Sequence, residues 1–107
     1  MRQEDPKVSS RIPQELIQRV VRQNFGRFRL CYEKGLRGNP NLGGRVSVRF
    51  VIGRDGGVMS ASDGGSSLPD ASVVSCVVSS FRGLQFPQGE EASVATVVYP
   101  IVFSPAK

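Results

Sequence analysis

The chain has 107 residues, of which 39% are hydrophobic, so it is long enough to bury one core and too short for two domains. No apolar run approaches the roughly 20 residues that span a bilayer, and the first residues lack the apolar stretch of a signal peptide. The formal charge is +5, but the arginines are spread along the chain instead of clustering with aromatics, which argues against a nucleic-acid-binding protein.

Residues 1–11 are polar, include Pro6 and show no hydrophobic periodicity. Segments of this composition do not bury enough apolar surface to fold. We therefore predict a disordered tether over residues 1–11, followed by a single domain over residues 12–105.

A helix is predicted to begin at Pro13 and to end near Gly35. Proline is tolerated in the first helical turn because its missing N–H costs nothing there, and glycine is suited to a left-handed cap. The apolar residues between them recur at spacings of three and four, which places them on one stripe of a helix. They are Ile17, Val20, Val21, Phe25, Phe28, Cys31 and Tyr32.

A β-hairpin is predicted over residues 44–63. Val46, Val48, Phe50 and Ile52 alternate with more polar residues, as in a strand with one buried face. The dipeptide at residues 55–56, Asp-Gly, predicts a type I′ turn.

A second helix is predicted to begin after Ser67, where Ser67 and Asp70 resemble a capping box and Pro69 lies in the first turn. The helix is rich in valine and serine, so its intrinsic propensity is poor and a strand is the competing interpretation. Its expected core stripe is Val73, Val74, Val77 and Phe81, with Cys76 on the flank.

A final strand is predicted over residues 92–103, and Pro100 places it at a sheet edge or at a bulge because proline cannot donate to a ladder. The element order α-β-β-α-β predicts an α+β fold, a three-stranded antiparallel sheet with two helices packed on one face. The strand over residues 45–52 is expected in the centre, and the final strand is expected to leave one edge open.

The sequence contains few residues of the kinds that form catalytic or metal-binding sites. Histidine is absent, which removes the commonest general base and metal ligand, and the two cysteines are far apart. The spacing of the loop carboxylates at Asp55, Asp63, Asp70, Glu90 and Glu91 selects no acid–base pair. We predict that the chain is not an enzyme and has no cofactor and no metal site.

Cys31 and Cys76 lie on or beside the core stripes of the two predicted helices. A disulfide between them and two buried thiols are both compatible with this spacing.

The chain from Gly44 to Phe103 resembles the C-terminal domain of TonB, the periplasmic energy-transduction protein of Gram-negative bacteria. The stretches that carry the resemblance are GRVSVRFVIGRDGGV, SSLPD, FRGLQFP and VVYPIVF. The cysteines lie in VRQNFGRFRLCYEKGL and VVSCVV, which resemble more closely the myxobacterial gliding-motility relatives of the AgmX/PglI C-terminal domain family.

This resemblance implies a periplasmic module at the end of an inner-membrane protein, with its membrane anchor upstream, that grips a segment of an outer-membrane or periplasmic partner. It also implies that Cys31 and Cys76 are oxidised to a disulfide. The expected mode is strand addition at the open edge of the last strand, in a monomer or an edge-swapped dimer. The residues expected to bind the partner are Val94, Thr96, Val97, Val98, Tyr99 and Ile101.

The alternative function is a basic scaffold that binds an anionic polymer, either cell wall or nucleic acid, through its scattered arginines. This hypothesis predicts binding that falls steeply with salt.

Overall fold

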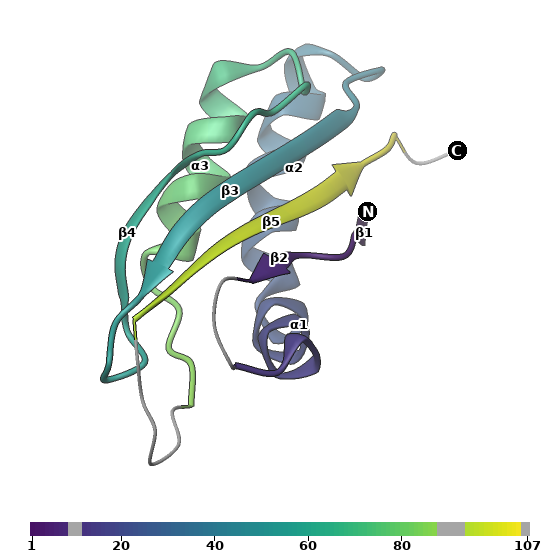
Figure 1. Ribbon diagram of the computed structural model, residues 1–107. Helices are drawn as coiled ribbons and strands as arrows, with labels where there is room; N and C mark the ends of the chain where they lie inside the picture. Colours follow the sequence, from purple (N-terminus) through teal and green to yellow (C-terminus); the bar gives the residue numbers. More distant parts are fainter. Residues whose placement is uncertain (9–11, 88–93, 106–107) are drawn as a thin grey trace.

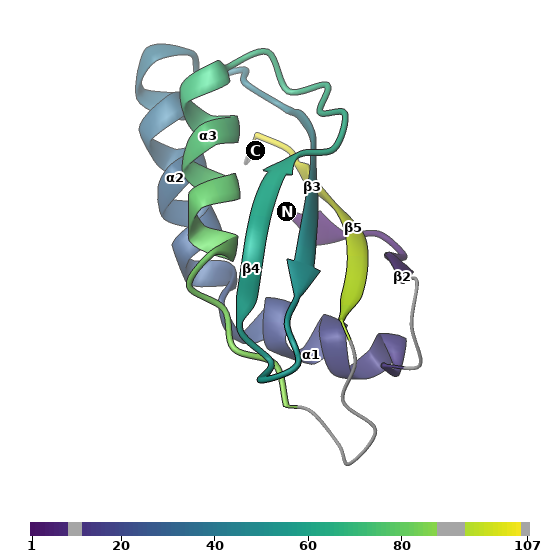
Figure 2. The same ribbon diagram turned by 60° about the vertical axis from the view of Figure 1, so that its left-hand side comes forward.

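The computed structural model describes residues 1–8, 12–87 and 94–105, and it shows three helices and a five-stranded antiparallel sheet (Figure 1). Helices α2 and α3 lie side by side over one face of the sheet, and α1 lies across the foot of α2 (Figure 2). The elements in chain order are β1 (Arg2–Gln3), β2 (Lys7–Val8), α1 (Gln14–Gln23), α2 (Phe25–Gly38), β3 (Gly44–Ile52), β4 (Val58–Asp63), α3 (Ala71–Phe81) and β5 (Ala95–Phe103).

The sheet confirms the predicted α+β class and the central position of β3. The strand order is β1-β5-β3-β4, and β2 also pairs with β5. The outer edge of β5, which we expected to be open, is therefore covered by the N-terminal residues. This arrangement also corrects the expectation of a disordered tether for residues 1–8, whereas residues 9–11 and the first two residues of the predicted last strand, 92–93, lie outside the described residues.

The first predicted helix is in fact two helices, because the backbone turns at Asn24. The side-chain amide of Asn24 donates to the carbonyl of Val20, which is the acceptor that its own N–H would use in a continuous helix. That N–H bonds instead to the carbonyl of Val21. The apolar stripe continues through the break, so the hydrophobic pattern alone does not reveal it.

Gly35 does not end a helix as predicted, since α2 continues to Gly38. A Cβ atom at Gly35 would lie 2.5 Å from Val73 Cγ2 and 2.6 Å from Leu42 Cδ2. The glycine is therefore required for the close approach of α2 to α3 and to the loop before β3.

Two local turns differ from the sequence prediction. Asp70, and not Ser67, caps α3, because its carboxylate accepts from the N–H of Val73 while the hydroxyl of Ser67 accepts from the N–H of Arg45. In the hairpin, only Gly56 has a positive φ, +88°, and its N–H bonds to the carbonyl of Gly53. This is a type I turn followed by a left-handed glycine and not a type I′ turn.

The core lies between the sheet and the helices. Phe81 of α3 stacks on Phe28 of α2 at 4.8 Å between ring centroids and contacts Phe50 of β3 at 5.1 Å. Every second residue of β5 is buried, which brings Tyr99 into the same cluster. No helix in the described part of the chain is long and apolar enough to cross a membrane.

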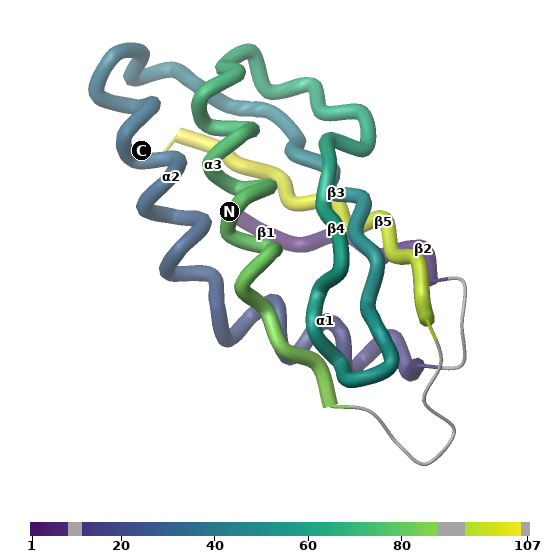
Figure 3. Tube along the Cα trace, turned by 90° about the vertical axis from the view of Figure 1, so that its left-hand side faces the viewer, coloured from purple at the N-terminus to yellow at the C-terminus, as the bar shows by residue number. Residues whose placement is uncertain are grey.

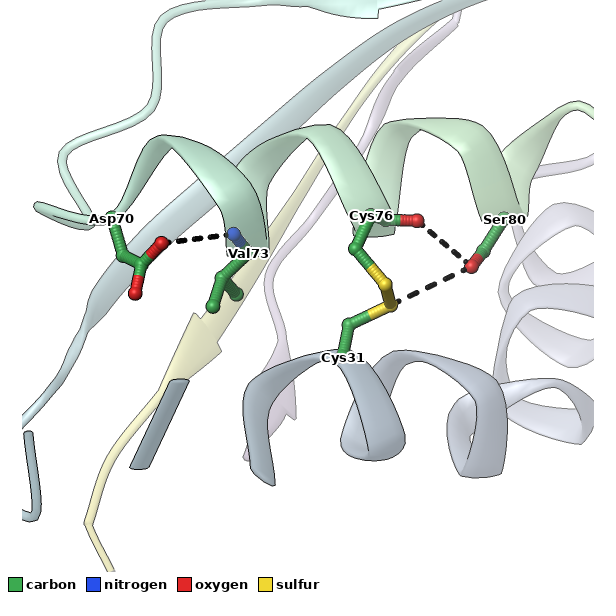
Figure 4. The surroundings of a disulfide bond; sticks show 5 residues. All are labelled: Cys31, Asp70, Val73, Cys76 and Ser80. Carbon is green, nitrogen blue, oxygen red and sulfur yellow. Dashed lines mark hydrogen bonds between the residues drawn. A yellow bond between two sulfur atoms is a disulfide. The ribbon is translucent and has the colours of Figure 1, made fainter. Parts of the chain in front are cut away.

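A disulfide joins α2 to α3. The sulfur atoms of Cys31 and Cys76 are bonded, and the two Cα atoms lie 5.6 Å apart (Figure 4). The hydroxyl of Ser80 lies 3.7 Å from the Cys31 sulfur and donates to the carbonyl of Cys76. The structure thus selects the disulfide over two separate buried thiols.

Candidate protein-interaction site

The outer edge of β5 is the place where the sequence predicts partner binding, and the chain's own N-terminus lies there (Figures 1 and 3). Both N-terminal strands run antiparallel to β5. The register pairs Arg2 with Val102 and Lys7 with Val98, so three residues between the two strands face two residues of β5. The edge of β5 therefore accommodates an extended segment, with one bulge.

The residues predicted to bind the partner divide between the two faces of the sheet. Val97, Tyr99 and Ile101 are buried beneath the helices, whereas Thr96 and Val98 project from the opposite face and are half-buried. Val94 precedes the strand and is 50% exposed. An added strand would thus meet the backbone of these residues more than the side chains of the buried three.

The direction of the backbone N–H and C=O groups shows which residues of β5 can form hydrogen bonds at the outer edge. The carbonyl of Pro100 accepts from the N–H of Glu4, so the backbone of Pro100 faces outward. Because direction alternates along an antiparallel strand, Val98 and Val102 also face outward, while Val97 faces β3. Proline has no backbone N–H, and at Pro100 this missing donor would point to the outer edge, where the N-terminal segment has its bulge. The hydrogen-bond ladder between β5 and β3 is therefore complete.

Side chains fix the N-terminal segment in place. The hydroxyl of Tyr99 donates to Oε1 of Gln3. Burial raises the pKa of Tyr99, an effect that the positive charge of Arg22 offsets only in part, so the hydroxyl stays protonated and remains a donor. Pro6 is buried, and Met1 and Val8 pack against the core.

The pairing of residues 1–8 with this edge was not predicted from the sequence. The two strands have two residues each, which is too short for a period of two to be recognised. The available signal was the hydrophobic character of Met1, Pro6 and Val8, which is lost among the charged residues between them.

Four basic side chains that are distant in sequence lie on the face of the sheet that the helices do not cover. Val98 pairs with both Lys7 and Arg49. In the same way, Arg2 and Arg45 flank Val102, and paired residues project from the same face. The Glu4 carboxylate lies 3.8 Å from each of these two arginines. The sequence pattern of spread arginines gave no indication of this grouping.

Comparison with known proteins supports the fold. The chain is similar to the C-terminal domain of TonB from Helicobacter pylori, whose solution structure was determined by NMR. The sequence identity is 17% and the TM-score is 0.54, over 91% of this chain and 87% of that chain. No protein-family model and no curated protein matches the sequence. The likeness establishes a fold of the TonB C-terminal type, while the closer relation to the gliding-motility family stays a prediction.

Proposed function

We propose that this protein is an interaction module of the TonB type, which binds an extended segment of a partner protein as an added strand on the outer edge of β5. The observation that carries the proposal is the pairing of residues 2–8 with that edge. An edge that takes an extended segment of its own chain has the backbone geometry to take one from a partner.

Partner binding at this edge requires the N-terminal segment to leave. The N-terminal segment is tethered, so it competes for the edge at a high effective concentration. The apparent association constant for any partner is the intrinsic constant multiplied by the fraction of molecules in which the edge is open. The pairing of the N-terminal segment is interrupted by the bulge between β1 and β2, so a partner strand without a bulge can form more of the ladder, except for the one bond whose donor Pro100 lacks. Displacement is thus an exchange of one strand for a better one.

The disulfide supports a location in an oxidising compartment, for which the periplasm is our proposal. The resemblance to TonB and to the gliding-motility relatives supports a position at the C-terminus of an inner-membrane protein. In this proposal, the module holds a segment of an outer-membrane or periplasmic partner and transmits energy or force, as in gliding motility. The absence of enzymatic activity remains a prediction.

The test releases the N-terminal segment and supplies it again as a separate peptide. Glu4→Pro removes the N–H that bonds to Pro100, whereas Asp5→Pro is the matched control at a position next to it, which lies in the bulge. We expect a synthetic peptide of residues 1–8 to bind the Glu4→Pro chain several-fold more tightly than the Asp5→Pro chain, by NMR titration of the backbone amides. Segments of candidate outer-membrane proteins are then tested as competitors. Equal affinity for the two variants, or shifts away from β5, would refute the proposal.

A second candidate function is binding of an anionic polymer by the uncovered sheet face. The observation that favours it is the flanking of Val98 by Lys7 and Arg49. It predicts that heparin, used as a model polyanion, binds with an affinity that falls steeply with salt and is weakened by Arg49→Gln. Binding of the strand peptide should depend on peptide sequence and persist at 0.2 M salt, a concentration of the order that weakens polyanion binding.

A further inference from the structure

The second edge of the sheet, that of β4, faces a groove. Helix α3 runs beside β4, and a loop connects the two elements (Figures 2 and 3). Ser66 and Leu68 of this loop line the groove. The groove has a volume of about 620 Å³. It is distinct from the edge of β5, which lies on the other side of β3.

The backbone of β4 presents hydrogen-bonding groups to this groove. The carbonyl of Ser47 accepts from the N–H of Gly64. Alternate residues of β3, including Arg49, therefore direct their backbone N–H and C=O groups toward β4. Their partners on β4 face inward, which leaves Ala61 and Asp63 with their N–H and C=O groups directed outward. The guanidinium of Arg82 confirms this direction independently, because its Nη2 donates to the carbonyl of Ala61 at 3.2 Å.

The floor of the groove is apolar and its ends carry opposite charges. Leu68, Val78 and Ala61 form the buried part of the lining, and Val74 is partly buried. Asp63 and Asp70 lie where the loop joins the two elements, whereas Arg82 follows the last turn of α3. The hydroxyl of Ser66 lowers the pKa of Asp63, so this end of the groove stays negative.

We propose that this groove binds an extended segment of a protein partner as a strand beside β4. Alternate side chains of such a strand enter the floor, where small aliphatic groups fit between Leu68 and Val78. A lysine or arginine of the partner lies at the end that holds Asp63 and Asp70, and an acidic residue lies at the Arg82 end. The partner's N–H replaces the Arg82 donor on the Ala61 carbonyl, which releases the guanidinium for that acidic residue.

A second copy of the chain is a poorer occupant by charge. Antiparallel pairing of two β4 edges centred on Ala61 would bring the two Arg82 guanidinium groups together at the twofold axis. Like charges in that position repel. The opposite charges at the two ends of the groove suit a segment that differs from β4 itself.

The test blocks the groove without changing the core. Ser75 lines the groove and is exposed on α3, so Ser75→Trp fills it from the surface. Ser72→Trp is the matched control, because Ser72 is also exposed on α3 but lines the separate pocket beside the disulfide. A phage library of random heptapeptides is selected on the full chain, and the enriched peptides are synthesised and titrated against both variants by NMR, with circular dichroism to check folding.

We expect enriched peptides with alternating small aliphatic residues, a basic residue at one end and an acidic residue at the other. Their affinity should fall about tenfold or more in Ser75→Trp and be unchanged in Ser72→Trp. Asp63→Asn, which keeps the acceptor for the loop but removes the charge, should weaken binding about threefold. Shifts should include the amides of Ala61 and Asp63 but none of β5.

Three results would overturn the proposal. The first is a selection that enriches no peptide sequence. The second is a set of enriched peptides that bind Ser75→Trp and Ser72→Trp with the same affinity. The third is self-association of the chain that Ser75→Trp abolishes, which would assign the groove to a second copy. Because the strand peptide of residues 1–8 reports on β5 separately, failure here leaves the proposed function of that edge intact.

Discussion

The two edges of the sheet are protected in different ways. The outer edge of β5 is covered by a segment of main chain, which satisfies backbone groups with backbone groups. The outer edge of β4 is protected by α3 and by the side chain of Arg82, which donates to the carbonyl of Ala61, while main chain covers it only just before the strand, where Gln85 pairs with Gly57 in the described part of the chain. Covering strands and charged side chains are both known means of preventing unwanted strand pairing. Each edge is thus closed by a group of the chain itself, and our two proposals hold that a partner strand replaces that group.

The disulfide should affect these edges unequally, because it holds α3, the wall of the β4 groove, to α2. The cysteines are 45 residues apart, and in the chain-entropy model closing such a loop stabilises the fold by about 4 kcal/mol. The double variant Cys31→Ser, Cys76→Ser should lose about this much in urea unfolding. In hydrogen exchange, amides that exchange by global unfolding should accelerate equally throughout the chain, whereas amides that exchange by local opening should accelerate more in α3 than in β5. Equal acceleration of the locally opening amides in α3 and β5 would contradict the separation of the two edges.

A proline scan of β5 tests the assignment of backbone direction. Val97→Pro removes a donor directed at β3 and leaves a buried carbonyl of Phe50 without its partner, so we expect a loss of about 3 kcal/mol or more. Val98→Pro removes a donor directed at the outer edge, and we expect about 1 kcal/mol. Thermal unfolding of the two variants measures the difference. A larger loss for Val98→Pro would mean that the strand faces the other way.

The contact between Tyr99 and Gln3 tests how firmly the N-terminal segment is held. Tyr99→Phe removes one hydrogen bond and keeps the ring in the core, so a loss of about 1 kcal/mol is expected. The amides of residues 2–8 should exchange faster, while those in α3 should not change. Tyr32→Phe is the control, because its hydroxyl bonds to the carbonyl of Leu42, away from the N-terminal segment. Identical exchange of residues 2–8 in the two variants would disprove the role of Tyr99.

The smallest expected effect concerns the acidic end of the β4 groove. Ser66→Ala should raise the pKa of Asp63 toward its ordinary value, and Ser67→Ala should leave it unchanged, as measured by NMR titration of the carboxyl group. Because the folded-state pKa is lowered, the ionised carboxylate stabilises the loop above the unfolded pKa of about 3.9. That contribution is lost as the pH falls through the folded-state pKa. An unchanged pKa in Ser66→Ala would remove this support for the charge of the groove.

The sequence predicts the parts of the fold that depend on periodicity. Alternation from Val46 to Ile52 identified the central strand, and Pro100 indicated an edge or a bulge, which the outward direction of its missing donor explains. The helix break was not predictable, since it depends on one side-chain hydrogen bond from Asn24 within an unbroken apolar stripe. The pairing of residues 1–8 with β5 depends on tertiary contacts of segments too short to show a pattern.

The sequence predicted which strand forms the candidate site, but not which side chains and backbone groups of that strand are accessible to a partner. The residues expected to bind a partner do lie on β5 or just before it, yet three of them point into the core. A period of two indicates that the faces alternate, but which face the helices cover and which backbone groups remain for a partner follow only from the register with β3 and with the N-terminal segment.

The measurement that most directly tests strand addition on β5 is an isotope-filtered NMR experiment on the Glu4→Pro chain bound to the synthetic peptide of residues 1–8. If the peptide adds as a strand, we expect cross-strand contacts between its backbone and the backbone of Val98 and Val102, with the antiparallel register that the native segment shows. Contacts with β4 or with the helices, or no contacts at the β5 backbone, would contradict it.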